Sequence, residues 1–155
     1  MLIRIFDKVL RELYRLFHPV LWGKNIQING IPRIYDSKNL KIGRNVSINS
    51  GCVLQCYGKL EIGDNVTISD GAKILTRQLR INDYVHNAQE REREHEDKKV
   101  VIGNGTWLAT NVIVLPGTNI PDNCIIAAGA VVTKNIEKES CLYGGVPAKM
   151  LKEIK

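Results

Sequence analysis

The sequence predicts an all-β protein built as a parallel β-helix, and two observations predict it. From Ile102 to Ile136 an Ile, Leu or Val returns every six residues, with an uncharged and mostly small residue four places after each. Every six-residue unit also contains Gly, Asn or Pro. An α-helix would spread these positions around its whole surface. Six-residue units instead fit a short strand and a turn, three units closing one triangular coil whose aliphatic residues stack in a column.

Composition limits the possible classes of protein. The chain has 155 residues, the length of a single domain, and a formal net charge of +6. This charge suits an anionic ligand or a membrane surface, and we expect no nucleic acid partner. The four cysteines include no CxxC pair, so we expect reduced thiols, a cytoplasmic location and no metal site. No apolar run reaches the roughly 18 residues that a transmembrane helix needs.

Residues 1–22 are predicted to form an amphipathic helix that Pro19 ends. One face is basic and the other is apolar. Two interpretations stay open. Residues 1–18 could lie on the inner face of a membrane, as basic amphipathic helices do, or the helix could pack on the β-domain or on another subunit. The basic face consists of Arg4, Lys8, Arg11 and Arg15.

The β-helix is predicted over residues 23–142, with one interruption. Regular six-residue spacing runs through Ile42 and Ile48, and again through Ile62 and Ile68. Residues 77–99 have no such spacing and are predicted to protrude as a loop, with six basic and six acidic residues. Long ordered loops usually carry function, and this one contains two of the three histidines.

Residues 143–155 are predicted to form a turn and a short helix that caps the stack. Gly144 and Gly145 supply the turn, and Pro147 opens the helix. Lys149 and Lys152 follow it.

Four segments together resemble the hexapeptide-repeat O-acetyltransferases of the maltose and galactoside branch. They read IGNGTW from Ile102, NVIVLPG from Asn111, AAGAVVTK from Ala127 and GGVPAK from Gly144. The N-terminus looks more like that of colanic-acid-type polysaccharide O-acetyltransferases. The resemblance implies a left-handed β-helix and a homotrimer. It also implies transfer of acetyl from acetyl-CoA to the hydroxyl of a sugar or glycan, in surface polysaccharide or lipopolysaccharide biosynthesis, with a loop histidine as general base.

The resemblance also implies site residues, matched by position. His86 would be the base, and Arg93, seven residues later, would contact the acceptor. Leu79 stands where many relatives carry a histidine, so His95, or the absence of any base, stays an open alternative. Two other functions also stay open, namely N-acetylation of an aminosugar and a non-catalytic scaffold. The expected acetyl-CoA contacts are Thr110, Ala128, Thr133, Lys134, Lys149 and Lys152.

Overall fold

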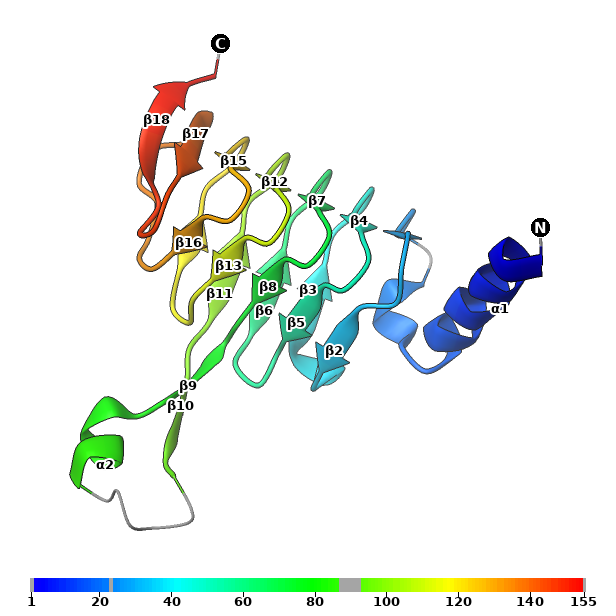
Figure 1. The fold of residues 1–155 in the computed structure, drawn as a ribbon, viewed down its shortest axis with the longest axis horizontal. Helices are drawn as coiled ribbons and strands as arrows, with labels where there is room; N and C mark the ends of the chain where they lie inside the picture. The colour runs from blue at the N-terminus through cyan, green and yellow to red at the C-terminus, as the bar shows by residue number, and fades with distance from the viewer. Residues whose placement is uncertain (1, 23, 87–92, 155) are drawn as a thin grey trace.

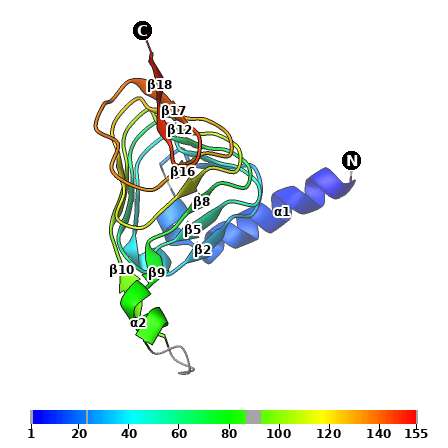
Figure 2. The same ribbon diagram turned by 60° about the vertical axis from the view of Figure 1, so that its left-hand side comes forward.

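The computed structural model describes residues 2–22, 24–86 and 93–154 of a tapering three-sided stack of coils (Figures 1 and 2). The chain begins with helix α1 (Leu2–Leu16), followed by the 3₁₀ helix η1 (Pro19–Leu21). Both lie at the first-coil end of the stack, and the C-terminus lies at the other end (Figure 1). Pro19 therefore opens the 3₁₀ helix rather than continuing α1, as its fixed φ and missing N–H favour.

Three sheets form the walls, and successive coils add parallel strands to them. The first wall consists of β1 (Gln27–Ile28), β4 (Ser47–Ile48), β7 (Thr67–Ile68), β12 (Trp107–Leu108), β15 (Ile125–Ile126), β17 (Cys141–Gly144) and β18 (Lys149–Glu153). The second consists of β2 (Arg33–Tyr35), β5 (Val53–Gln55), β8 (Lys73–Ile74), β13 (Ile113–Val114) and β16 (Val131–Val132). The third, after the short helix η2 (Ser37–Asn39), consists of β3 (Leu40–Ile42), β6 (Leu60–Ile62), β11 (Val100–Ile102) and β14 (Asn119–Ile120).

The core is a set of aliphatic columns that run along the stack. In the first wall, Ile28 pairs with Ile48, Ile48 with Ile68, Ile68 with Leu108, and Leu108 with Ile126, all in parallel register. Burying each such side chain contributes about 1.5–3 kcal/mol. The inward positions predicted from the six-residue period are all at most 4% exposed, which confirms them: Ile42, Ile48, Ile62, Ile68, Ile102, Leu108, Val114, Ile120 and Ile126.

Asparagines hold one row of corners. Asn25, Asn45 and Asn65 stand one coil apart, each with a positive φ between 52° and 59°. The Nδ2 of Asn25 donates to Oδ1 of Asn45 at 2.9 Å, and the Nδ2 of Asn45 donates to Oδ1 of Asn65 at 3.0 Å. Asn suits these corners because it tolerates the left-handed conformation and can also hydrogen-bond to its copy in the next coil.

Residues 77–86 and 93–99 leave the stack as a hairpin with two antiparallel strands, which projects from the corner between the second and third walls (Figure 2). It contains β9 (Arg77–Leu79), α2 (Ile81–His86) and β10 (His95–Asp97). At its base, the Lys98 N–H donates to the Thr76 carbonyl at 2.8 Å, and the buried Thr76 hydroxyl donates to the Gln55 carbonyl at 2.7 Å. These bonds fix where the hairpin departs.

The prediction of a capping helix within residues 143–155 is wrong. Lys149–Glu153 forms the strand β18, which pairs antiparallel with β17. Without β18, the outer edge of β17 would be an open row of backbone donors and acceptors at the end of the sheet. Pairing with that edge outweighs the modest helix propensity of a five-residue segment.

Candidate active site

An open recess of about 420 Å³ lies at the C-terminal end of the stack, where β16, β17 and β18 meet. Lys134 reaches it from just after β16, and Lys149 from the first position of β18. Tyr143 and Ala148 supply part of its floor. The antiparallel return of the chain is what brings Lys149 beside Lys134, fifteen positions earlier in the sequence.

Positive charge dominates the polar side of this recess. Lys138 also lines it, but its ammonium is paired with Glu153, which raises the pKa of Lys138. Within residues 2–22, 24–86 and 93–154, Lys134 and Lys149 form no ion pair, and both are exposed. Two such ammonium groups are point charges well suited to phosphate oxygens.

The other expected cofactor contacts lie apart from this recess. Thr110 and Ala128 occupy the corner between the first and second walls in successive coils, and the Gly129 N–H donates to the Thr110 carbonyl at 2.9 Å. Thr133 is exposed directly after β16, next to Lys134. The structure therefore brings Lys134 and Lys149 to one recess and leaves Thr110, Ala128 and Thr133 along the flanking coils.

Lys152 lies in a second recess, of about 610 Å³, against the first wall. Its neighbours there include Trp107 and Ile125. The indole Nε1 of Trp107 donates to the Ser69 hydroxyl at 2.9 Å, which holds the ring against the wall. Lys152 and Lys149 thus line different recesses, a difference that their three-residue spacing does not reveal.

The hairpin places its two histidines differently. His86 is the last residue of α2 and is exposed. His95 is exposed in β10 and pairs directly with Leu79 of β9. Arg93, the expected acceptor contact, lies with its guanidinium carbon 5.3 Å from the centre of the Tyr84 ring. Arg93 therefore interacts within the hairpin.

An aromatic and charged strip at the base of the hairpin was not anticipated from the sequence. The Arg77 guanidinium lies 3.8 Å from the centre of the Tyr57 ring, and the Tyr57 and Tyr35 ring centres are 6.4 Å apart. Arg77 also holds Asp97 through two bonds, Nε to Oδ1 at 2.6 Å and Nη2 to Oδ2 at 2.8 Å, which lower the pKa of Asp97. The sequence feature that could have predicted this strip is the pair of tyrosines, Tyr35 and Tyr57, at the same corner of successive coils.

Two further findings concern groups that other classes of protein would need. Across the described ranges, no cluster of three or more His, Cys, Asp or Glu residues could hold a metal ion. No helix in the described part of the chain is long and apolar enough to cross a membrane.

The three-walled stack and its basic terminal recess define a hexapeptide-repeat β-helix protein. Residues 99–134 match the family model described as bacterial transferase hexapeptide (six repeats). The chain belongs to the hexapeptide-repeat acetyltransferase family.

Known proteins of this family extend the likeness over most of the chain. The galactoside O-acetyltransferase of Escherichia coli K12 is 32% identical over 132 residues, which are 85% of this chain and 53% of that protein. The chain spans only 53–56% of the first curated relatives that it matches.

Two solved structures share the fold. A maltose O-acetyltransferase from Clostridium difficile 630 has a TM-score of 0.80 at 28% identity, over 96% of this chain and 86% of that one. A hexapeptide-repeat acetyltransferase from Vibrio cholerae, complexed with acetyl coenzyme A, has a TM-score of 0.82 at 26% identity, over 96% and 79%. The expected left-handed parallel β-helix is confirmed.

Proposed function

We propose that the chain is an acetyltransferase that moves the acetyl group of acetyl-CoA to a hydroxyl of a sugar or glycan. The observation that carries the proposal is the recess in which Lys134 and Lys149 converge. Both lysines stand at positions matched to the cofactor contacts of the maltose and galactoside branch, although they are far apart in sequence. The Vibrio cholerae relative with acetyl coenzyme A supports the same donor.

The recess can hold the phosphates of the cofactor, and the coils can hold its extended part. Lys134 and Lys149 offer ammonium donors to phosphate oxygens. Thr133 adjoins them, while Thr110 and Ala128 lie at the preceding corner of the second wall. A pantetheine chain laid along this wall would meet these small side chains in turn.

The base is a histidine of the hairpin, and one observation favours His95 over the expected His86. His95 lies opposite Leu79, the position at which the sequence resemblance leads us to expect a histidine in many relatives. Residues directly opposite in an antiparallel pair project to the same face, so His95 can serve the space that a histidine at position 79 would serve. His86 lies farther out, at the end of α2.

Each step then balances without a metal. The histidine takes the hydroxyl proton while the oxygen attacks the thioester carbonyl carbon, and the carbonyl electrons move to an oxyanion. Backbone N–H groups can donate to that oxyanion. When the oxyanion collapses, the C–S bond breaks and the histidinium returns its proton to the leaving CoA sulfur. A positioned base of this kind typically contributes about 10²–10⁴-fold.

A homotrimer would supply the rest of the site, because the recesses that hold Lys134, Lys149 and Lys152 are open. The hairpin supports this part of the proposal. Ile81 and Val85 of α2 are 72% and 64% exposed, and an apolar tip on a projecting arm is suited to contact a neighbouring subunit. His95 and the cofactor recess of two adjacent copies could then form one site.

The acceptor is expected to be a glycan of surface polysaccharide or lipopolysaccharide biosynthesis in the cytoplasm. The membrane contact expected of residues 1–18 stays a prediction of the sequence, and the orientation of α1 weakens its electrostatic basis. Arg11 and Arg15, half of the expected basic face, bond to backbone carbonyls of the first coil.

The experiment is release of CoA thiol from acetyl-CoA in the presence of a panel of sugars, aminosugars and glycans. Acceptor-dependent release with hydroxyl sugars supports the proposal. Release only with aminosugars would mean N-acetylation instead. If no acceptor gives release above the hydrolysis rate, a scaffold whose base is lost at Leu79 becomes the better interpretation.

A further inference from the structure

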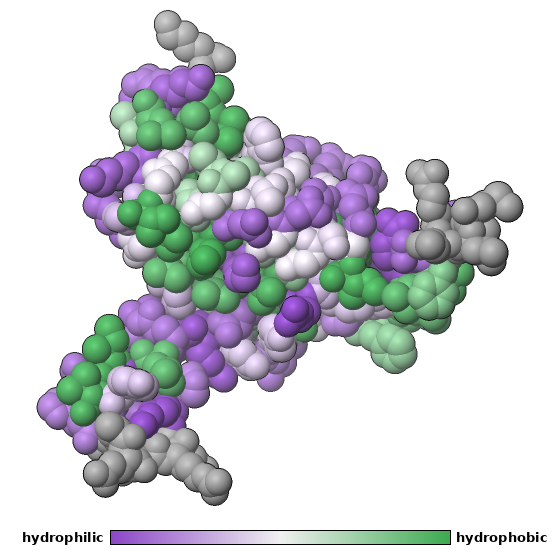
Figure 3. All heavy atoms as spheres, in the orientation of Figure 1, coloured by the Kyte–Doolittle hydropathy of each residue, from purple (hydrophilic) through white to green (hydrophobic). Residues whose placement is uncertain are grey.

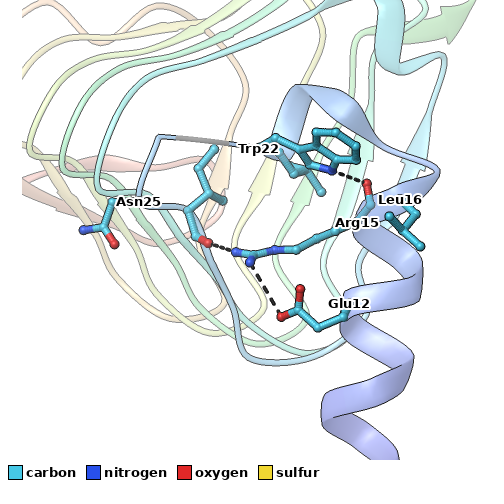
Figure 4. A pocket seen from close by; sticks show the side chains of 7 residues that line it. Glu12, Arg15, Leu16, Trp22 and Asn25 are labelled. Carbon is cyan, nitrogen blue, oxygen red and sulfur yellow. Dashed lines mark hydrogen bonds and ion pairs between the residues drawn. The ribbon is translucent and has the colours of Figure 1, made fainter.

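Helix α1 turns its polar side toward the β-helix. The Arg11 Nη1 donates to the Ile28 carbonyl at 3.0 Å, and the Arg15 guanidinium donates to the Ile26 carbonyl. Figure 4 shows Arg15 reaching from the helix to the first coil. In the described part of the chain, strand β1 pairs with β4 alone, so its other edge is the end of the sheet. The two arginines therefore cap carbonyls at an open sheet edge, which natural sheets must protect.

A third bond helps to fix the rotation of the helix. The Trp22 indole Nε1 donates to the Arg15 carbonyl at 2.6 Å, which ties the end of α1 to the segment after η1 (Figure 4). Tyr14 packs partly buried against the core from the same side. Turning α1 to bury its apolar side on its own subunit would break all of these contacts.

The opposite side of α1 is an exposed apolar stripe. Phe6, Val9, Leu13 and Leu16 are 66%, 53%, 47% and 59% exposed, and we call them the α1 seam. Figure 3 shows apolar side chains gathered along this helix beside the polar surface of the stack. Their spacing of three, four and three residues is the a/d pattern of helices that pair.

The seam borders a shallow groove that suits an identical helix. Lys8, Val9, Glu12, Leu13 and Leu16 line the groove, whose volume is about 350 Å³. Lys8 and Glu12 are one helical turn apart with opposite charges, and Glu12 also lies 3.7 Å from the Arg15 guanidinium of its own helix, which leaves its second oxygen for a partner. When the same helix lies antiparallel, Lys8 of each copy faces Glu12 of the other, which is the reciprocal arrangement of a two-fold interface.

We propose that the α1 seam binds the α1 seam of a second copy of this chain in an antiparallel pair. A two-fold axis near residues 10–11 would set Val9 against Leu13 and Lys8 against Glu12. A bilayer is the less favoured occupant. Arg11 and Arg15 are committed to carbonyls, and the charges beside the seam, Lys8 with Asp7 and Glu12, do not favour anionic lipid.

One helix pair would be weak, and several acting together would be strong. A helix of 15 residues is about 22 Å long, too short to bury the roughly 1,600 Å² of a standard interface. In the proposed trimer, three α1 helices would lie at the first-coil end, so three pairs would join two trimers and reinforce each other. The inference rests on the proposed function only in this respect: the number of helix pairs, three, follows from the proposed trimer.

The test compares the masses of wild type and Leu13→Glu by light scattering at equal concentration. We expect the mass of Leu13→Glu to be half that of wild type, because a buried unpaired carboxylate opposes the pairing. Val146→Glu, a change at an exposed apolar side chain near the other end of the stack, should keep the wild-type mass. Unchanged circular dichroism would show that Leu13→Glu still folds.

Charge swaps test the antiparallel arrangement separately. Lys8→Glu and Glu12→Lys should each lower the mass, because each places like charges together. Since Glu12→Lys also removes the ion pair with Arg15, the deciding result is that mixing the two variants restores the mass. Equal masses for wild type and Leu13→Glu would overturn the proposal. The proposal would also be overturned if wild type floated with phosphatidylglycerol vesicles, Leu13→Glu did not, and the two proteins had the same mass. Acetyl transfer is measured on the same samples. Activity without helix pairing would overturn only the pairing, and pairing without activity would overturn only the proposed function.

Discussion

Leu79 and His95 lie directly opposite each other in the antiparallel pair of β9 and β10. Opposite Cβ atoms in such pairs are about 4.5–5.5 Å apart. Asp97 follows His95 by two positions, on the same face of β10, and is held by Arg77. A histidine on the returning strand therefore lies beside position 79 of the departing strand, where the sequence resemblance leads us to expect a histidine in many relatives.

The first prediction is that His95→Ala lowers kcat by about 10²–10⁴-fold with little change in KM for acetyl-CoA, because only proton removal is lost. His86→Ala is the matched control and should retain most turnover. Moving the histidine across the pair, with Leu79→His added to His95→Ala, should restore part of the rate. Loss of turnover in His86→Ala but not in His95→Ala would instead assign the base to α2.

The second prediction concerns the basic recess. The double variant Lys134→Glu with Lys149→Glu should raise KM for acetyl-CoA more than it lowers kcat, because it removes binding that ground state and transition state share. Lys152→Glu is the control, since Lys152 lines the recess beside Trp107. An equal increase in KM for Lys152→Glu alone would mean that the cofactor lies along the first wall.

The sequence predicted the core well and the ends poorly, for a physical reason. Inward residues such as Ile68 and Ile120 follow from a local period, and each coil repeats the same environment. The strand over Lys149–Glu153 depends on an unpaired sheet edge that exists only after the stack has formed. The opposition of Leu79 and His95 likewise depends on hairpin register, which a sequence without six-residue phase does not specify.

The third prediction tests the aliphatic columns. Ile68→Ala should lower the free energy of unfolding by about 2–5 kcal/mol. The Ile68 side chain is 0% exposed, so its truncation leaves a cavity in the aliphatic column. Thr67→Ala, one residue earlier and facing outward on β7, should cost much less. Denaturant titration measures both. Equal losses would mean that β7 does not alternate between core and solvent.

The fourth prediction separates corner conformation from corner hydrogen bonding. Asn45 has a φ of +57° and bonds to Asn25 and Asn65. Asn45→Gly loses only the hydrogen bonds, while Asn45→Ala also holds a Cβ in the left-handed region at about 1–2 kcal/mol. Asn45→Ala should therefore unfold at lower denaturant concentration than Asn45→Gly. The reverse order would show that backbone strain at this corner is negligible.

The last prediction concerns the cysteines and alkaline pH. Cys52, Cys56, Cys124 and Cys141 are free and 0% exposed, and burial raises the pKa of Cys56 from its ordinary 9.0 to about 12. None of the four should react with a thiol reagent at pH 8 until denaturant is added, since the thiolate is the reactive form.

The sign of the pH dependence follows from the raised pKa of Cys56. The folded state keeps this thiol protonated when the unfolded chain has already lost the proton, so the contribution to stability is complete below pH 9.0. It is lost as pH rises toward about 12. Burial also raises the pKa of Tyr14 to about 12, which adds to the same decline. Cys56→Ala should therefore flatten the fall in unfolding free energy between pH 9 and 11. An identical slope in wild type and Cys56→Ala would show that this thiol ionises as easily in the folded protein as in the unfolded chain.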